Sequence, residues 1–115
     1  MHTVIIVLNL VTSLISALAG VIGLVRPARL SGSNQVLWGE VYYSRMYAAR
    51  AVPFGLLAGI LPFYSGGPLA AWVLFIAAVI QIIDVGIGYV EKDSRMIAGA
   101  SLAAIIHVLC GLAIR

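Results

Sequence analysis

Charge and cysteine are scarce in this chain of 115 residues. Only 10% of the residues are charged, whereas soluble domains carry about a quarter. The one cysteine, Cys110, excludes a disulfide within the chain and a metal cluster built on cysteines. A soluble globule this small could not bury a composition that is 63% hydrophobic. The sequence therefore excludes a soluble enzyme, a disordered tail and a secreted disulfide scaffold, and it indicates an integral membrane protein.

The motifs of soluble chemistry are missing as well. The chain has no P-loop, nucleophile elbow, GxGxxG or HExxH sequence. His107 with Asp84 and Glu40 offers too few ligands for a metal site. Seven basic residues exceed four acidic ones, but they form no run that would favour nucleic acid. We therefore expect no metal, no cofactor and no nucleic-acid partner, and we assign the basic excess to the positive-inside bias of membrane proteins.

Four long apolar runs are what the chain does contain. About twenty mostly apolar residues cross the hydrocarbon core of a bilayer as a helix. The runs are continuous rather than alternating, which favours helices over barrel strands. The sequence predicts one all-α domain over residues 1–115, an antiparallel bundle of four transmembrane helices. The expected helices are 3–25, 42–64, 68–90 and 96–114.

The connections predict caps and an orientation. The turn 65–67 leads into Pro68, which suits the first position of a helix, and Asp93 or Ser94 can cap the last helix. No basic residue precedes the first run, so we expect it to be a retained helix rather than a cleaved signal. Loops 26–41 and 91–95 share one face of the bundle, and they are expected to be cytoplasmic because basic residues gather there. That face has Arg26, Arg29, Lys92 and Arg95 against Arg115 on the other, so both termini are expected outside the cytoplasmic (inner) membrane.

Polar residues inside the predicted spans are the candidates for a site. An ionisable group at the middle of a bilayer costs at least about 2.5–3.5 kcal/mol, so it needs a partner or a hydrated cavity. With a rise of about 1.5 Å per residue, four such residues lie at similar depth on three helices. They are Arg50, Gln81, Asp84 and His107. We expect them to meet around a hydrated cavity, with Arg50 and Asp84 joined as a two-bond fork.

Helical periodicity extends this predicted site along the second span. Spacings of three and four residues put a stripe of five side chains on one face. The stripe is Glu40, Tyr43, Tyr47, Arg50 and Phe54. Gly55 and Gly59 lie on the other side, where they suit close packing of helices. The hydroxyls of Thr12, Ser13 and Ser16 are expected to bond to their own helix backbone.

These groups can carry out acid–base chemistry. We assign Asp84 as general base, Arg50 or Tyr47 as the group that stabilises an oxyanion, and His107 as proton shuttle. Substrate would contact Glu40, Tyr43, Gln81 and Phe54. The set suits isomerisation, cyclisation or epoxide opening of a lipophilic small molecule.

Other functions fit the same residues. A proton- or anion-coupled transporter or channel would use the carboxylate and imidazole as a relay and the guanidinium as an anion site. A structural accessory subunit would use the ion pair only to hold the helices in register. The expected partners are membrane lipids, a lipophilic small molecule and further copies of the chain in a homo-oligomer.

The stretch 43–50 (YSRMYAAR), the glycine-rich segment after it, Asp84 and His107 resemble small four-helix membrane proteins of the DoxX-like type. The resemblance implies a four-helix bundle in the cytoplasmic membrane of bacteria. Since the activities of those proteins are mostly unassigned, it implies little chemistry. The first span lacks the membrane-embedded glutamate of the small multidrug transporters, so that family is excluded.

Overall fold

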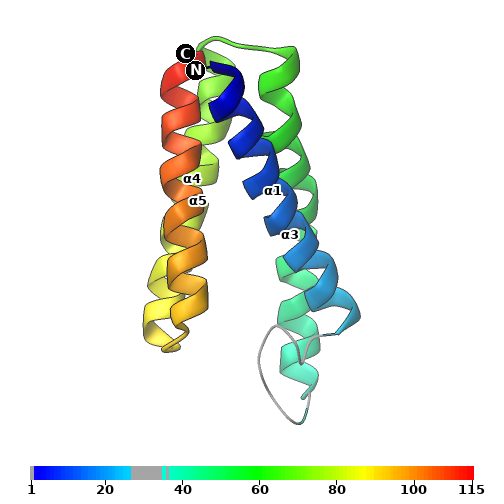
Figure 1. Ribbon diagram of the computed structural model, residues 1–115. Helices are drawn as coiled ribbons and strands as arrows, with labels where there is room; N and C mark the ends of the chain where they lie inside the picture. The colour runs from blue at the N-terminus through cyan, green and yellow to red at the C-terminus, as the bar shows by residue number, and fades with distance from the viewer. Residues whose placement is uncertain (1, 27–34, 36) are drawn as a thin grey trace.

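The computed structural model describes residues 2–26, 35 and 37–115. In this part the chain forms four α-helices and no strand, and successive helices run in opposite directions (Figure 1). The helices are α1 (His2–Val25), α3 (Trp38–Tyr64), α4 (Pro68–Val90) and α5 (Ser94–Ile114). The predicted all-α four-helix bundle is thereby confirmed.

Helix α3 begins four residues before the predicted position 42, so residues 38–41 belong to the helix rather than to the loop. The carboxylate of Glu40 accepts a hydrogen bond of 2.7 Å from the backbone N–H of Leu37. A carboxylate in the first turn satisfies a free N–H group and interacts favourably with the helix dipole. Hydropathy alone missed this start because Glu40 is charged.

The two short connections have the expected turn and cap residues. Gly67 has a φ of 95°, which glycine adopts without steric cost, and its N–H donates to the carbonyl of Ile114 over 2.6 Å. Pro68 then opens α4, as predicted. The side chain of Asp93 accepts from the N–H of Met96 over 3.2 Å and caps α5, which confirms the first of the two predicted caps.

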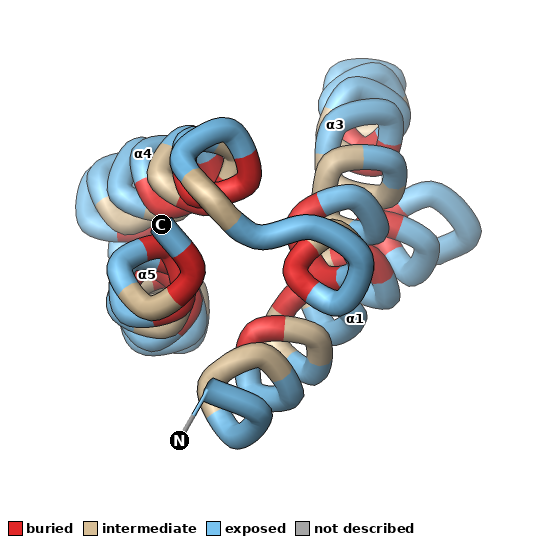
Figure 2. Tube along the Cα trace, turned by 90° about the horizontal axis from the view of Figure 1, so that it is seen from above, coloured by how far each residue is buried: buried red, intermediate tan, exposed pale blue. Residues whose placement is uncertain are grey.

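The helices associate as two pairs. Helix α1 packs along α3, and α4 packs along α5, whereas contacts between the pairs are fewer and lie between α1 and α5 and between α3 and α4. Seen along the bundle, the pairs form two separate groups (Figure 2). They approach each other near the termini and diverge toward the opposite end (Figure 1). We call the boundary between α1/α3 and α4/α5 the seam.

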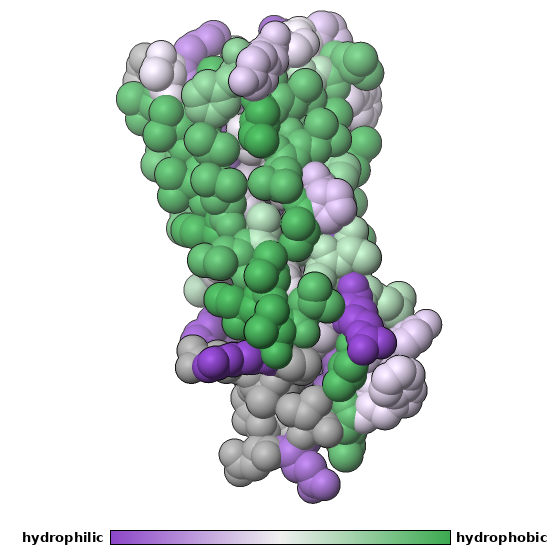
Figure 3. All heavy atoms as spheres, turned by 90° about the vertical axis from the view of Figure 1, so that its right-hand side faces the viewer, coloured by the Kyte–Doolittle hydropathy of each residue, from purple (hydrophilic) through white to green (hydrophobic). Residues whose placement is uncertain are grey.

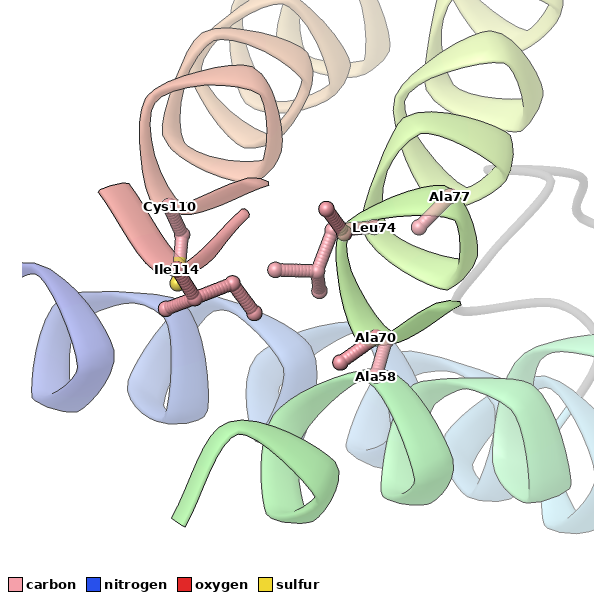
Figure 4. Close-up of a cluster of buried hydrophobic side chains, with 7 residues drawn as sticks. Ala58, Ala70, Leu74, Ala77, Cys110 and Ile114 are labelled. Carbon is pink, nitrogen blue, oxygen red and sulfur yellow. The ribbon is translucent and has the colours of Figure 1, made fainter. Parts of the chain in front are cut away.

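Small side chains fill the interior and large apolar ones lie outside. Apolar side chains cover the middle of the face in Figure 3, and strongly hydrophilic residues gather toward one end. Leu74 is the largest of the fully buried apolar side chains in the described chain. The core cluster, drawn in Figure 4, consists of Ala58, Ala70, Ala71, Leu74, Ala77, Cys110 and Ile114.

This distribution is the one that lipid requires. Bundles in a membrane use small residues where helices touch, because the lipid chains solvate large aliphatic side chains. The helices contain between 21 and 27 residues, and each is long and apolar enough to cross a bilayer. The chain is therefore a multi-pass membrane protein.

Gly55 and Gly59 are part of the surface of α3 that contacts α1. A Cβ atom at position 59 would lie 2.9 Å from the Cβ of Ser13, and one at position 55 would lie 3.1 Å from the carbonyl oxygen of Ser13. The predicted close packing at these glycines is confirmed, and the neighbour is α1 of the same chain.

We expect Gly59→Ala to destabilise the bundle by about 1–3 kcal/mol, because the added methyl group overpacks the α1–α3 contact. Gly86→Ala is the matched control, because no described atom lies within 4 Å of its Cβ position and alanine favours a helix by about 1 kcal/mol over glycine. Denaturant-induced loss of helicity in detergent micelles measures both. Equal effects of the two substitutions would contradict the packing described.

Candidate functional site

A small cavity lies at the seam and is lined by residues from all four helices. Its volume is about 30 Å³, which is room for about two water molecules. Six of the residues predicted for the site line it. They are Tyr47, Arg50, Phe54, Gln81, Asp84 and His107. Ser13 and Ser16 of α1 complete its polar lining, so the cavity is more polar than the sequence indicated.

The structure brings Arg50 of α3 and Asp84 of α4 together. The Nη2 atom of Arg50 lies 3.2 Å from Oδ1 of Asp84, and this is the one hydrogen bond between them in the described chain. The expected two-bond fork is therefore not formed. The Asp84 side chain is 8% exposed and that of Arg50 is 43% exposed. The carboxylate thus lies inside and the guanidinium at the edge of the cavity.

Tyr47 lies one turn from Arg50 on α3 and contacts the same guanidinium. The Cζ atom of Arg50 is 5.6 Å from the centre of the Tyr47 ring. At this distance the face of the ring attracts a cation. Arg50 is therefore held from two sides, by an aromatic ring and by a carboxylate.

A second polar contact joins α1 to α5. Nδ1 of His107 lies 2.7 Å from Oδ1 of Asn9, and Nδ2 of Asn9 donates to the carbonyl of Ala58 on α3 over 2.7 Å. His107 is 2% exposed and Asn9 is fully buried. The two polar contacts, Arg50–Asp84 and Asn9–His107, each cross the seam, one between α3 and α4 and the other between α1 and α5.

Glu40 and Tyr43 lie outside the cavity, in contrast to the expectation that they contact substrate there. The Glu40 carboxylate binds the Leu37 N–H at the start of α3. Tyr43 is 69% exposed and packs edge-on against Tyr42, with ring centres 5.8 Å apart. Ten helical residues separate Glu40 from Arg50, or about 15 Å along the axis, so a shared face does not bring both ends to one small cavity.

The sequence reasoning missed Asn9 and misassigned Ser13. The hydroxyl of Ser13 has no hydrogen-bond partner among the described residues, although the residue is 1% exposed. The expectation that it bonds to its own backbone was therefore wrong. For Asn9 a signal existed: an amide in an apolar span needs a partner as a charge does, because an unpaired amide there costs several kcal/mol.

The donor set suits acid–base chemistry and anion binding. The cavity combines a carboxylate, a guanidinium, an imidazole and hydroxyl groups. No group of three or more potential metal ligands occurs within residues 2–26, 35 and 37–115. Comparison of the chain with protein-family models, with curated proteins and with solved structures found no match.

We expect Arg50→Gln and Asp84→Asn to be non-additive. Each single change leaves one charge without its partner, so the double variant should cost about 1 kcal/mol less than the sum of the single variants, a size typical of partly exposed pairs and of polar contacts in membranes. The free energy of unfolding in micelles gives the coupling. Arg45→Gln combined with Asp84→Asn is the control and should be additive, since Arg45 lies over the ring of Trp38 instead.

Proposed function

We propose that this membrane protein binds the polar end of a lipophilic small molecule at Arg50 and Asp84 and carries out acid–base chemistry on it. The observation that carries this proposal is the ion pair at the edge of the cavity. The Arg50 side chain is 43% exposed, and its guanidinium shares one hydrogen bond with the carboxylate of Asp84, whose side chain is 8% exposed. Arginine has five N–H donors, so most of them remain for a ligand.

The size of the cavity limits what can enter it. Pockets that enclose a whole drug-sized ligand measure roughly 300–1,000 Å³. This cavity measures about 30 Å³, so it suits a single carboxylate, carbonyl or hydroxyl group. The apolar remainder of the ligand would lie in the lipid beside α3 and α4. Phe54, which lines the cavity, would contact the first carbons of that apolar part.

The chemistry follows from the groups around that polar end. Asp84 would accept a proton from a carbon next to the bound carbonyl, while Arg50 and the Tyr47 hydroxyl stabilise the oxyanion that forms. Return of the proton to another carbon gives an isomerisation, which needs no oxidant or reductant. Cyclisation and epoxide opening use the same acid and base. The resemblance to DoxX-like proteins adds no reaction and stays a prediction.

Transport is the second candidate, and the seam favours it. Apart from packing near the termini, the two helix pairs are joined by two polar contacts, and such pairs can rock against each other. The pairs have the same orientation, because each begins at the end of the bundle that holds the termini (Figure 1). They therefore lack the inverted orientation typical of many transporters, so the case for transport rests on the seam alone.

The charges also support an orientation in the cytoplasmic membrane. Arg26, Lys92 and Arg95 lie at the end of the bundle opposite the termini, while Arg29 lies outside the described residues. Arg115 is the basic residue at the end that holds the termini. The positive-inside rule then assigns the loop end to the cytoplasm and the termini to the outside.

We expect native mass spectrometry of the purified protein to detect a co-purifying amphipathic molecule. Arg50→Gln should remove at least about nine-tenths of that adduct, a loss of 1.4 kcal/mol or more in binding. Arg45→Gln should retain it. Arg45 has the same charge as Arg50 and lies on the same helix, but its guanidinium packs over the ring of Trp38. Equal adduct in both variants would contradict the site, and flux across vesicles without a retained ligand would favour transport.

The same spectrum counts the copies in the homo-oligomer, which we expect to be at least a dimer.

Introduced cysteines test the orientation. Cys110 is fully buried, so the unaltered chain is the blank for a membrane-impermeant thiol reagent. In intact cells Ser65→Cys should react, because residue 65 is exposed at the end that holds the termini. Glu91→Cys should react only after the cells are opened. The reverse pattern would contradict the orientation.

A further inference from the structure

We infer that Asn9 holds His107 in the tautomer protonated at Nδ1, so that Nε2 is a proton acceptor at a water-binding site shared with Ser13 and Asp84. Asn9 is here a positioning residue that acts through His107. The inference goes beyond the proposed function, because it concerns the ligand-free protein and holds for enzyme and transporter alike.

The orientation of the Asn9 amide follows from its neighbour on α3. One terminal atom of the side chain lies 2.7 Å from the carbonyl oxygen of Ala58. A carbonyl only accepts hydrogen bonds, so that atom is the donating Nδ2. The other terminal atom is Oδ1, which only accepts, and it lies 2.7 Å from Nδ1 of His107.

The tautomer of His107 follows from the amide. Since Oδ1 of Asn9 accepts, Nδ1 of His107 must donate and therefore carries a proton. In the neutral ring Nε2 then has the free lone pair. His107 lines the cavity and has no second hydrogen bond in the described chain, so Nε2 is the nitrogen that remains for a group in the cavity.

The cavity has the size and the polar groups of a water site. A volume of about 30 Å³ holds about two waters, and a buried water needs two to four polar partners. Ser13 lines the cavity, and its hydroxyl is buried and has no partner among the described residues. Ser13, His107 and Asp84 line the cavity from α1, α5 and α4, and their hydroxyl, Nε2 and second carboxylate oxygen would supply these partners.

Such a water would connect the two proton-accepting groups. Asp84 and His107 line the same cavity from α4 and α5 but share no hydrogen bond in the described chain. A proton taken up by Asp84 would pass through the water to Nε2 and return by the same path to the other carbon of the substrate, so that both groups regain their starting protonation. Because Nδ1 is committed to Asn9, Nε2 is the one ring nitrogen that can receive that proton.

Nitrogen-15 NMR of the folded chain tests the tautomer directly. The sequence has two histidines, so histidine labelling in a His2→Gln background reports His107 alone. We expect an Nδ1–H resonance and an unprotonated Nε2 near neutral pH. A protonated Nε2 in this chain would overturn the inference, whatever the ligand or activity of the protein.

Substitutions at Asn9 test its positioning role. Asn9→Ala removes the acceptor, so we expect the Nε2 resonance to shift toward the protonated position as the tautomers mix. Asn9→Asp keeps an oxygen acceptor and should retain the Nδ1–H form. No shift in Asn9→Ala, or loss of the Nδ1–H form in Asn9→Asp, would overturn the role of Asn9. Because the unaltered chain already tests the tautomer, a misfolded variant does not remove the test.

The water site has its own measurement in the same sample. Magnetisation should pass from water to the His107 ring in the unaltered chain, and Ser13→Val should abolish the transfer by filling the cavity and removing a hydroxyl. Thr12→Val, which also removes a hydroxyl from α1 but at a residue that does not line the cavity, should leave it intact. Absence of transfer in the unaltered chain, or its persistence in Ser13→Val, would overturn the water site.

Discussion

The cost of leaving polar groups unpaired in an apolar medium governs how this bundle is held together. In lipid the hydrophobic effect does not press helices against each other, so close van der Waals packing and polar contacts must do so. Within each pair, packing suffices, because Gly55 and Gly59 let α1 approach α3 closely. Across the seam, the core cluster around Leu74 packs the two pairs together, and two polar contacts also bridge the helices. The residues of these two contacts are also the ones that supply the proposed site.

Much of the fold was predictable because it depends on local features of the sequence. Apolar runs of the right length predicted four helices, and Asp93 and Pro68 predicted where two of them begin. The contact of Arg50 with Asp84 was predictable for a different reason. An unpaired charge is costly in lipid, so each of the two charges needs a partner. At this depth the opposite charge is one of few partners available to it. The count of hydrogen bonds between them was not predictable, since it depends on how far the helix pairs diverge.

The remainder of the site depends on tertiary contacts that a single sequence does not contain. Asn9 and His107 lie 98 positions apart, and they meet because the first and last helices are neighbours. Helical periodicity placed Glu40 and Tyr43 on the same face as Arg50. Periodicity gives the direction in which a side chain points, but it does not bring side chains at different positions along the helix axis to one cavity. Ser13 was assigned to its own backbone because serines in helices often bond there. In this chain Ser13 packs against Gly59, and its hydroxyl has no partner among the described residues.

A site at the seam has a physical consequence for how such a protein can evolve or be altered. Leu74 only packs, whereas Arg50, Asp84, Asn9 and His107 join the helix pairs and, in the proposed function, also take part in the chemistry. Their loss therefore weakens the bundle and removes chemistry together, so activity alone does not separate the two roles. Two measurements separate these roles. The protonation state of the His107 ring nitrogens reports on the proposed chemistry, and the coupling energy between Arg50 and Asp84 reports on how firmly the helices are joined. A polar contact that merely held the helices would need neither an unpaired serine hydroxyl nor room for water beside it, and this seam has both.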